Sequence, residues 1–308
     1  MPPSRNATAQ TLALTLAATL AATFQGAVPA QAADDPAPVV GNLTGGDVTP
    51  RGSAPANGPE VRAKAAAAAA FHRALVRADT RGARIALDAD PSARILTSAT
   101  ATGGTQRTTE ASATTLTAAT TTELGADKYL PMEHRPQGKS YWCGPATGQM
   151  MIRTANGVGF HSRFNGDGLY QANLATWAHM QTDSYGSTSW HREQFTRGLT
   201  RWRGNDYYKQ FSNPSSDHLK HALTYSIGGR DLPIALDTVE FAGGRHYNGH
   251  PIGRTIGHWI AGYGYSDLGR YGHYADPSTS VFPDARPKFS YGSSSMATHF
   301  LNQNGLVY

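Results

Sequence analysis

The chain has 308 residues, a formal net charge of +5, 39% hydrophobic and 16% charged residues, and a single cysteine. Its length predicts one or two domains. One cysteine excludes an intramolecular disulfide framework and a cysteine-rich zinc site. The basic excess is small and contains no basic block, so we expect no nucleic-acid partner.

Residues 1–32 have the pattern of a secretory signal peptide. Arg5 is the only charged side chain before an apolar stretch rich in Ala, Leu and Thr, and Ala30-Gln31-Ala32 fits a cleavage site. An uncleaved membrane anchor is the weaker alternative, because a span needs about 20 apolar residues. The sequence therefore predicts a secreted, extracellular protein with no integral membrane domain once the signal is removed.

Residues 33–125 are a low-complexity segment rich in Ala and Thr. Within it, residues 59–88 combine Ala with Arg and Lys, which favours a helix, although the apolar stripe is too narrow to form a core by itself. Two interpretations remain open. The segment is either a linker or a pro-segment whose helix covers the active site until it is removed.

The aromatic residues mark the compact domain. Of the 5 Trp, 14 Tyr and 10 Phe, only Phe24 and Phe71 precede residue 126. Aromatic side chains supply the largest single burials in a core, so we expect the folded domain at residues 126–308. Ordinary packing is favoured over a substrate cleft for four of them: Trp190, Trp202, Tyr207 and Tyr208.

Helices come first in this domain and strands later. Apolar spacing and capping signals predict helices over residues 143–156, 168–181, 216–227 and 293–302. Segments rich in Ile, Val, Trp and Tyr predict strands over residues 128–131, 232–239, 255–265 and 271–276. This order favours an α+β fold over alternating βαβ units.

The most informative block is the one around Cys143, which opens a predicted helix. The positive end of a helix dipole favours a thiolate, the nucleophilic form of cysteine. Gly144 is expected to leave room for a substrate carbonyl, and Pro145 suits a first helical turn. The alternative is a small buried hydrophobe. An unpaired thiol in an exported protein is a liability unless it is buried or used.

Three further residues complete a candidate site. His258 lies in a predicted strand between Gly257 and Gly262, and Asp276 ends the next strand, from which it could orient the imidazole. Gln137 precedes Cys143 by six residues in a loop and could donate to an oxyanion. Each has a plain alternative: a hydrogen-bonded core histidine, a strand-ending Asp before Pro, and a solvated loop glutamine.

In combination, the block from Gln137 through Cys143-Gly-Pro-Ala, the Gly-His-Trp strand at His258 and the Asp-Pro at Asp276 resemble the C39-like peptidases, a branch of the papain-like cysteine proteases. The resemblance covers residues 126–308. It implies a papain-like fold in which a helical lobe carries the cysteine and a β-rich lobe carries the histidine and the aspartate. It also implies Cys143 as nucleophile, His258 as base and acid, Asp276 as orienting carboxylate and Gln137 as oxyanion donor.

The predicted function is a secreted cysteine peptidase that cleaves peptide or protein substrates, cell-wall peptides among them, as a monomer and without a cofactor. A transglutaminase or amidase using the same chemistry, and a catalytically silent wall-binding module, remain as alternatives. No zinc site is expected. His246 and His250 are four residues apart around Gly249, without an HExxH motif, and His218 and His221 have no evident third ligand.

Overall fold

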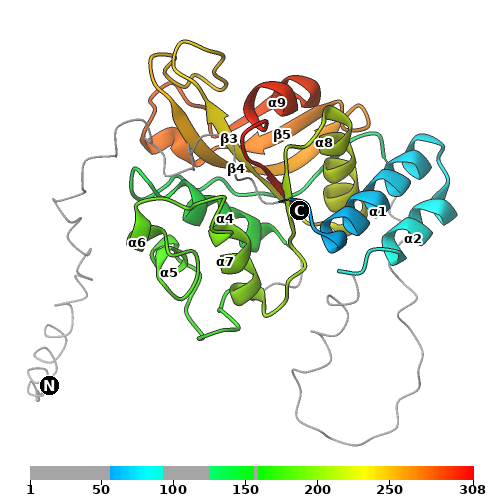
Figure 1. The fold of residues 1–308 in the computed structure, drawn as a ribbon, viewed down its shortest axis with the longest axis horizontal. Helices are drawn as coiled ribbons and strands as arrows, with labels where there is room; N and C mark the ends of the chain where they lie inside the picture. The colour runs from blue at the N-terminus through cyan, green and yellow to red at the C-terminus, as the bar shows by residue number, and fades with distance from the viewer. Residues whose placement is uncertain (1–55, 93–124, 156–158) are drawn as a thin grey trace, which may run out of the picture. The chain divides into compact units, whose positions relative to one another are not determined.

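A computed structural model describes residues 56–92, 125–155 and 159–308 (Figure 1). The predicted signal peptide lies outside the described residues, as does much of the low-complexity segment. The helices are α1 (Pro59–Val76), α2 (Thr80–Asp88), α4 (Cys143–Thr154), α5 (Gln171–Ala175), α6 (Thr182–Tyr185), α7 (Gln194–Arg203), α8 (Ser216–Ala222), the π-helix η1 (Leu223–Gly229), the 3-10 helix η2 (Pro277–Ser280) and α9 (Ser293–Phe300). The strands are β1 (Lys128–Tyr129), β2 (Gln210–Ser212), β3 (Ile234–Glu240), β4 (Ile256–Ser266), β5 (Tyr271–Ala275), β6 (Lys288–Gly292) and β7 (Gly305–Val307).

The strands of the described ranges form one antiparallel sheet. Its order is β2-β7-β3-β4-β5-β6, and β1 pairs with β4 beside this path. The long strand β4 is central: it pairs with β3 from Ile256 to Gly262 and with β5 from Ala261 onwards. The helix-first, strand-later order of the sequence therefore gives the α+β fold that was predicted.

Hydrophobic cores lie on both faces of this sheet. Because strand side chains alternate between faces, neighbouring residues of β3 and β4 belong to different cores. Ile234, Leu236 and Ile260 pack with α8 and α9, whereas Ala235, Trp259 and Ala261 pack with α4 and α7. In Figure 1, α4 and α7 lie on one side of strands β3–β5 and α9 on the other.

Helix α1 belongs to the core that it shares with α8, η1 and α9. Phe71 is fully buried and meets Tyr225 of η1 edge-on, with ring centroids 5.8 Å apart. Lys64 is also buried, and its Nζ donates to the Tyr207 carbonyl at 2.6 Å. The distribution of aromatic residues did not reveal that α1 joins the core, because alanine methyls and one Phe supply most of the contact that this helix makes. The core therefore extends beyond residues 126–308.

This packing bears on the expectation that a helix of residues 59–88 covers the active site. In the described structure, α1 and α2 pack on the α8–η1 side of the sheet, whereas the helix that begins at Cys143 packs on the opposite side. These contacts give no support to the expectation that α1 covers Cys143. Removal of the segment stays a prediction.

The region of residues 168–181 differs from the single helix predicted there. Helix α5 ends at Ala175 because Thr176 is extended, and Gln181 adopts a left-handed conformation with φ of 60°. This turn directs Met180 into the core, where it packs on Gly148 and Gly198. Tertiary packing of one side chain thus overrides the helical spacing.

Helix α7 was not predicted, although its pattern could have revealed it. Phe195, Leu199 and Trp202 recur at helical spacing, and all three are fully buried. The four aromatic residues Trp190, Trp202, Tyr207 and Tyr208 belong to this core, as the packing interpretation predicted. Among the residues described here, no helix has both the length and the apolar character that crossing a membrane requires.

The buried position of Phe71 predicts that α1 contributes to stability. Phe71→Ala should lower the free energy of unfolding of the full chain by about 3–5 kcal/mol, because it removes a buried aromatic ring and leaves a cavity. Chemical denaturation measures this change. The matched control is Val76→Ala on the same helix, where the side chain is 55% exposed; its effect should stay within about 0.5 kcal/mol. Equal effects of the two variants would contradict the packing of α1.

Candidate active site

Cys143 is the first residue of α4 and is fully buried. One turn later, Thr147 donates its hydroxyl to the Trp259 carbonyl of β4 at 2.9 Å. The Trp259 indole N–H in turn donates to the Thr188 carbonyl at 2.9 Å, and the Thr188 side chain packs on the first turn of α4. These contacts hold the start of α4 against the part of β4 that carries His258.

Gly144 makes a close packing contact. The space beside it is filled by Thr188: a Cβ on Gly144 would lie 2.6 Å from the Thr188 Cβ. The Thr188 hydroxyl is itself held by the hydroxyl of Thr182, 2.8 Å away. The glycine is therefore required by its packing against Thr188, and the expectation that it leaves room for a substrate carbonyl stays a prediction.

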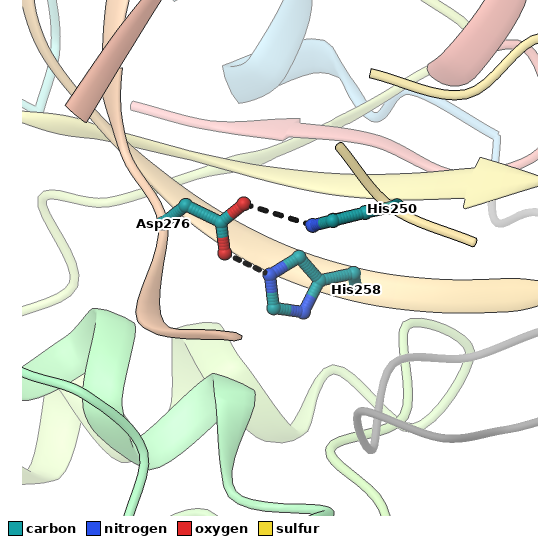
Figure 2. Close-up of side chains that lie close together, drawn as sticks. All are labelled: His250, His258 and Asp276. Carbon is teal, nitrogen blue, oxygen red and sulfur yellow. Dashed lines mark hydrogen bonds and ion pairs between the residues drawn. The ribbon is translucent and has the colours of Figure 1, made fainter. Parts of the chain in front are cut away.

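His258 and Asp276 meet through the register of two strands. Ala275 of β5 pairs with Ala261 of β4. Asp276 is the next residue, so it lies beside the stretch of β4 that carries His258. His258 Nε2 is 2.7 Å from Asp276 Oδ1, and both side chains are fully buried (Figure 2). Because a carboxylate only accepts, Nε2 carries the proton. His258 Nδ1 is buried and has no hydrogen-bond partner among the described residues.

The Asp276 carboxylate accepts four hydrogen bonds. Oδ1 accepts from His258 and from the backbone N–H of Ser278 at 2.8 Å, and Oδ2 accepts from His250 Nε2 at 2.9 Å and from the Asn248 amide at 2.7 Å. Burial alone would raise the pKa of Asp276, but the two imidazoles and their hydrogen bonds hold this pKa well below its usual range. Asp276 is thus kept as a charged acceptor inside the protein.

Sequence reasoning missed His250 as a partner of Asp276. Its Nδ1 lies 2.6 Å from Glu240 Oε1 at the end of β3, and the other Glu240 oxygen lies 3.0 Å from His246 Nδ1. Figure 2 shows one Asp276 oxygen directed at His250 and the other at His258. Glu240 was the signal that could have revealed this network. It stands at the end of β3, which is buried along its whole length, and a buried carboxylate needs partners.

Electrostatics define the state of His250. Burial lowers its pKa, but hydrogen bonds and charges from Asp276 and Glu240 outweigh burial and raise the pKa to about 9. The ligand atoms of His250, His258 and Asp276 lie within 4.8 Å of one another, close enough to consider a metal ion. However, both His250 nitrogens face carboxylates, which favours a doubly protonated ring with no lone pair for a metal. The arrangement therefore fits a hydrogen-bonded charge network.

Gln137 is buried, which excludes the solvated loop glutamine considered from the sequence. Its backbone N–H donates to the Pro277 carbonyl at 2.9 Å, so its loop is attached to the residue after Asp276. The side-chain amide donates to the carbonyls of Lys139 and Ser140, at 2.9 and 2.6 Å. In this arrangement neither amide hydrogen is left over for an oxyanion, and the amide holds the loop that leads to Cys143.

The other histidines raised as metal candidates have structural surroundings. His218 of α8 stacks on Phe211 with ring centroids 3.5 Å apart, and burial lowers its pKa to about 3. His221 packs on His72 of α1, and burial, followed by the charge of His72, lowers its pKa to about 4. Both rings are therefore neutral: His221 lies at the α1–α8 interface, and His218 packs against β2.

With this geometry established, the comparison with known proteins gives the class. Residues 128–295 match the Peptidase_C39 like family, and the chain belongs to this family. The matched range contains the helix that begins at Cys143, together with His250, His258 and Asp276. Membership indicates a cysteine peptidase and agrees with the papain-like fold predicted from the sequence.

Among solved structures, the chain is similar to xylellain, a cysteine protease from Xylella fastidiosa, with 13% sequence identity and a TM-score of 0.31. The similarity covers 59% of this chain and 85% of that one. No curated protein matches the chain.

The contact between Gly144 and Thr188 predicts a costly substitution. Gly144→Ala should lower the free energy of unfolding by about 1–3 kcal/mol, because the added methyl overpacks the first turn of α4. Thermal or chemical denaturation measures the loss. Gly253→Ala makes the same change where no atom lies within 4 Å of the new Cβ, and its stability should remain near that of the wild type. If both variants were equally stable, the packing role of Gly144 would be rejected.

The raised pKa of His250 predicts how stability changes with pH. A folded-state pKa of about 9, against about 6.5 for unfolded histidine, stabilises the fold fully below pH 6.5. This stabilisation is lost as pH rises towards 9. Relative to His250→Gln, the wild type should lose on the order of 3 kcal/mol of unfolding free energy over this range.

Denaturant titrations at a series of pH values measure the two profiles. Taking the difference between wild type and variant cancels the contribution of Lys64, whose pKa is lowered by burial and whose titration acts in the opposite sense. Parallel profiles between pH 6.5 and 9 would show that His250 is not charged in the folded protein.

Proposed function

We propose that this protein is a secreted cysteine peptidase that hydrolyses peptide bonds with Cys143, His258 and Asp276. The observation that carries the proposal is the buried hydrogen bond of 2.7 Å from His258 Nε2 to Asp276 Oδ1. It directs the proton to one ring nitrogen and leaves Nδ1 as the nitrogen that can exchange a proton with a thiol. Family membership supports the same chemistry.

The start of α4 supports Cys143 as the nucleophile. A helix N-terminus carries partial positive charge, which stabilises a thiolate at its first residue. One turn after Cys143, Thr147 is hydrogen-bonded to the carbonyl of Trp259, the residue that follows His258, at 2.9 Å. This contact supports a cysteine on the part of β4 that carries the histidine.

The reaction proceeds in two halves. The Cys143 thiolate attacks the peptide carbonyl carbon, and the tetrahedral adduct collapses as His258 Nδ1 gives its proton to the leaving amine. A thioester to Cys143 remains. His258 then takes a proton from water as the water attacks the thioester, and the carboxylic acid product leaves with the return of the thiolate–imidazolium pair. Asp276 holds the ring and stabilises its charged form throughout.

Gln137 is proposed as the oxyanion donor only on a specific condition. One of its amide hydrogens must leave the carbonyl of Lys139 or Ser140 and turn to the substrate when the adduct forms. The backbone at the start of α4 is the alternative donor, since the first N–H groups of a helix lack intrahelical partners. The proposed substrate class is peptides or proteins outside the cell, including wall peptides, and the proposed form is a monomer.

Activity against a fluorescent casein substrate and a synthetic wall-stem peptide tests this function. Cys143→Ala should abolish hydrolysis, and His258→Ala should lower kcat/KM by about 10²–10⁴, the usual contribution of a general acid–base. His161→Gln is the matched control, because that ring is exposed on the surface. Hydrolysis that persists in Cys143→Ala would reject the proposal.

Alkylation of Cys143 by iodoacetamide, followed by intact mass, gives a readout that needs no substrate. Because the chain has one cysteine, the mass shift has one thiol target. Labelling should be fast at about pH 5–6 and lost in His258→Ala, as a thiolate–imidazolium pair requires. Labelling that rises only near pH 8–9 favours a catalytically silent module, and incorporation of an amine into a glutamine substrate favours transglutaminase chemistry.

A further inference from the structure

A chain of buried hydrogen bonds and ion pairs continues beyond Asp276, away from His258. His250 Nε2 bonds to Asp276, and His250 Nδ1 bonds to Glu240 at 2.6 Å. The second Glu240 oxygen lies 3.0 Å from His246 Nδ1 and accepts from the Tyr247 backbone N–H at 3.2 Å. Glu240 and Asp276 are both fully buried, so His250 joins two carboxylates that water does not reach.

The two carboxylates that face the nitrogens of His250 determine which protonation state of the ring is favoured. A neutral imidazole has one N–H and one lone pair, so it can donate to only one carboxylate, whereas an imidazolium donates to both. Two buried carboxylates without a cation between them would be strongly unfavourable. The ring therefore lies where a positive charge is most stabilised.

The groups that face His250 come from every element packed around it. Glu240 comes from β3 and His258 from β4, whose ring centroid lies 5.4 Å away. The segment between these strands contributes His246, Tyr247 and Asn248, the strand β5 leads to Asp276, and Ser278 and Phe282 follow it. Of these, the two carboxylates and the two other histidines are the groups whose charge bears on His250 within the described structure.

We propose that His250, held between Glu240 and Asp276, is a positioning residue of the active site: its charge neutralises Glu240 and keeps Asp276 ionised and directed at His258. This inference rests on the proposed function of Cys143, His258 and Asp276. The His250 ring lies edge-on to the His258 ring, with centroids 5.4 Å apart, but its two nitrogens face Glu240 and Asp276, so it exchanges no proton in the proposed reaction. It acts through the Oδ2 atom of Asp276, leaving Oδ1 to His258.

Charge counting gives the sign of the effect. In the wild type, Glu240 and His250 cancel, so the reacting pair faces one net negative charge, that of Asp276. In His250→Gln, Glu240 adds a second buried negative charge, which disfavours the Cys143 thiolate. In the double variant Glu240→Gln with His250→Gln, the wild-type net charge returns. If His250 contributed only packing, the added Glu240→Gln substitution would not restore the behaviour of the wild type.

The test is the pH dependence of Cys143 alkylation by iodoacetamide, measured on the full chain by intact mass. The acid limb of the wild-type profile should shift up by about one pH unit in His250→Gln, which is about tenfold slower labelling at a fixed pH on that limb. The double variant should return more than half of the shift. His161→Gln, an exposed histidine, should leave the profile unchanged.

The outcomes separate this inference from the proposed function. If the wild-type alkylation profile has its acid limb at low pH and His250→Gln does not shift it, the inference is overturned and the proposed function stands. The same follows if the acid limb of the double variant is shifted as far as that of His250→Gln. A wild-type acid limb near pH 8–9 overturns the proposed function, and the positioning role falls with it.

A measurement on the unaltered protein covers the case in which His250→Gln does not fold. Two-bond ¹H–¹⁵N spectra of the histidine rings report the protonation of each nitrogen. We expect both nitrogens of His250 to be protonated at pH 7.5, because Glu240 and Asp276 each accept from one of them. A neutral tautomer of His250 at that pH would overturn the inference.

Discussion

The buried carboxylate of Asp276 is the constraint on which the site depends. A charged oxygen pair in a protein interior is stable only when donors surround it, and Asp276 has four, two on each oxygen. These donors come from β4, from the segment between β3 and β4, and from the first turn of η2. The hydrogen bonds of one side chain therefore tie together three parts of the β-rich half, and His258 is oriented as a result.

The helix that begins at Cys143 packs on one face of the same sheet. Helix α4 packs through Thr147 on the backbone of β4, and Thr188 is wedged between the first turn of that helix and Trp259. The core with α1, α8 and α9 lies on the other face and stiffens the same strands. Packing on both faces thus leaves β4 little freedom, which suits a strand that carries the proposed acid–base group, His258.

Several features of the fold and site follow from local patterns in the chain. The start of α4 at Cys143, strands β3, β4 and β5, and helices α8 and α9 were predicted within a few residues, because their apolar periodicity and flanking glycines agree with their packing. The pairing of Asp276 with His258 followed from the expectation of adjacent antiparallel strands. Local patterns failed where packing on residues distant in the chain decides the outcome: Met180, in the turn after α5, packs on Gly148 and Gly198, and Thr188 fills the space beside Gly144.

The sequence by itself determined the α+β order, the position of the one cysteine at a helix start, and the candidate residues Cys143, His258 and Asp276. Only the tertiary structure decided that α1 joins the core, that the Gln137 amide holds its own loop, and that His250 and Glu240 extend the charged network. The physical reason is the range of the interactions. Helix starts and strand alternation are encoded within a few neighbouring residues, whereas a buried charge is stabilised by whichever partners the fold brings to it, here Glu240, His250 and Asp276 across 36 positions of the chain.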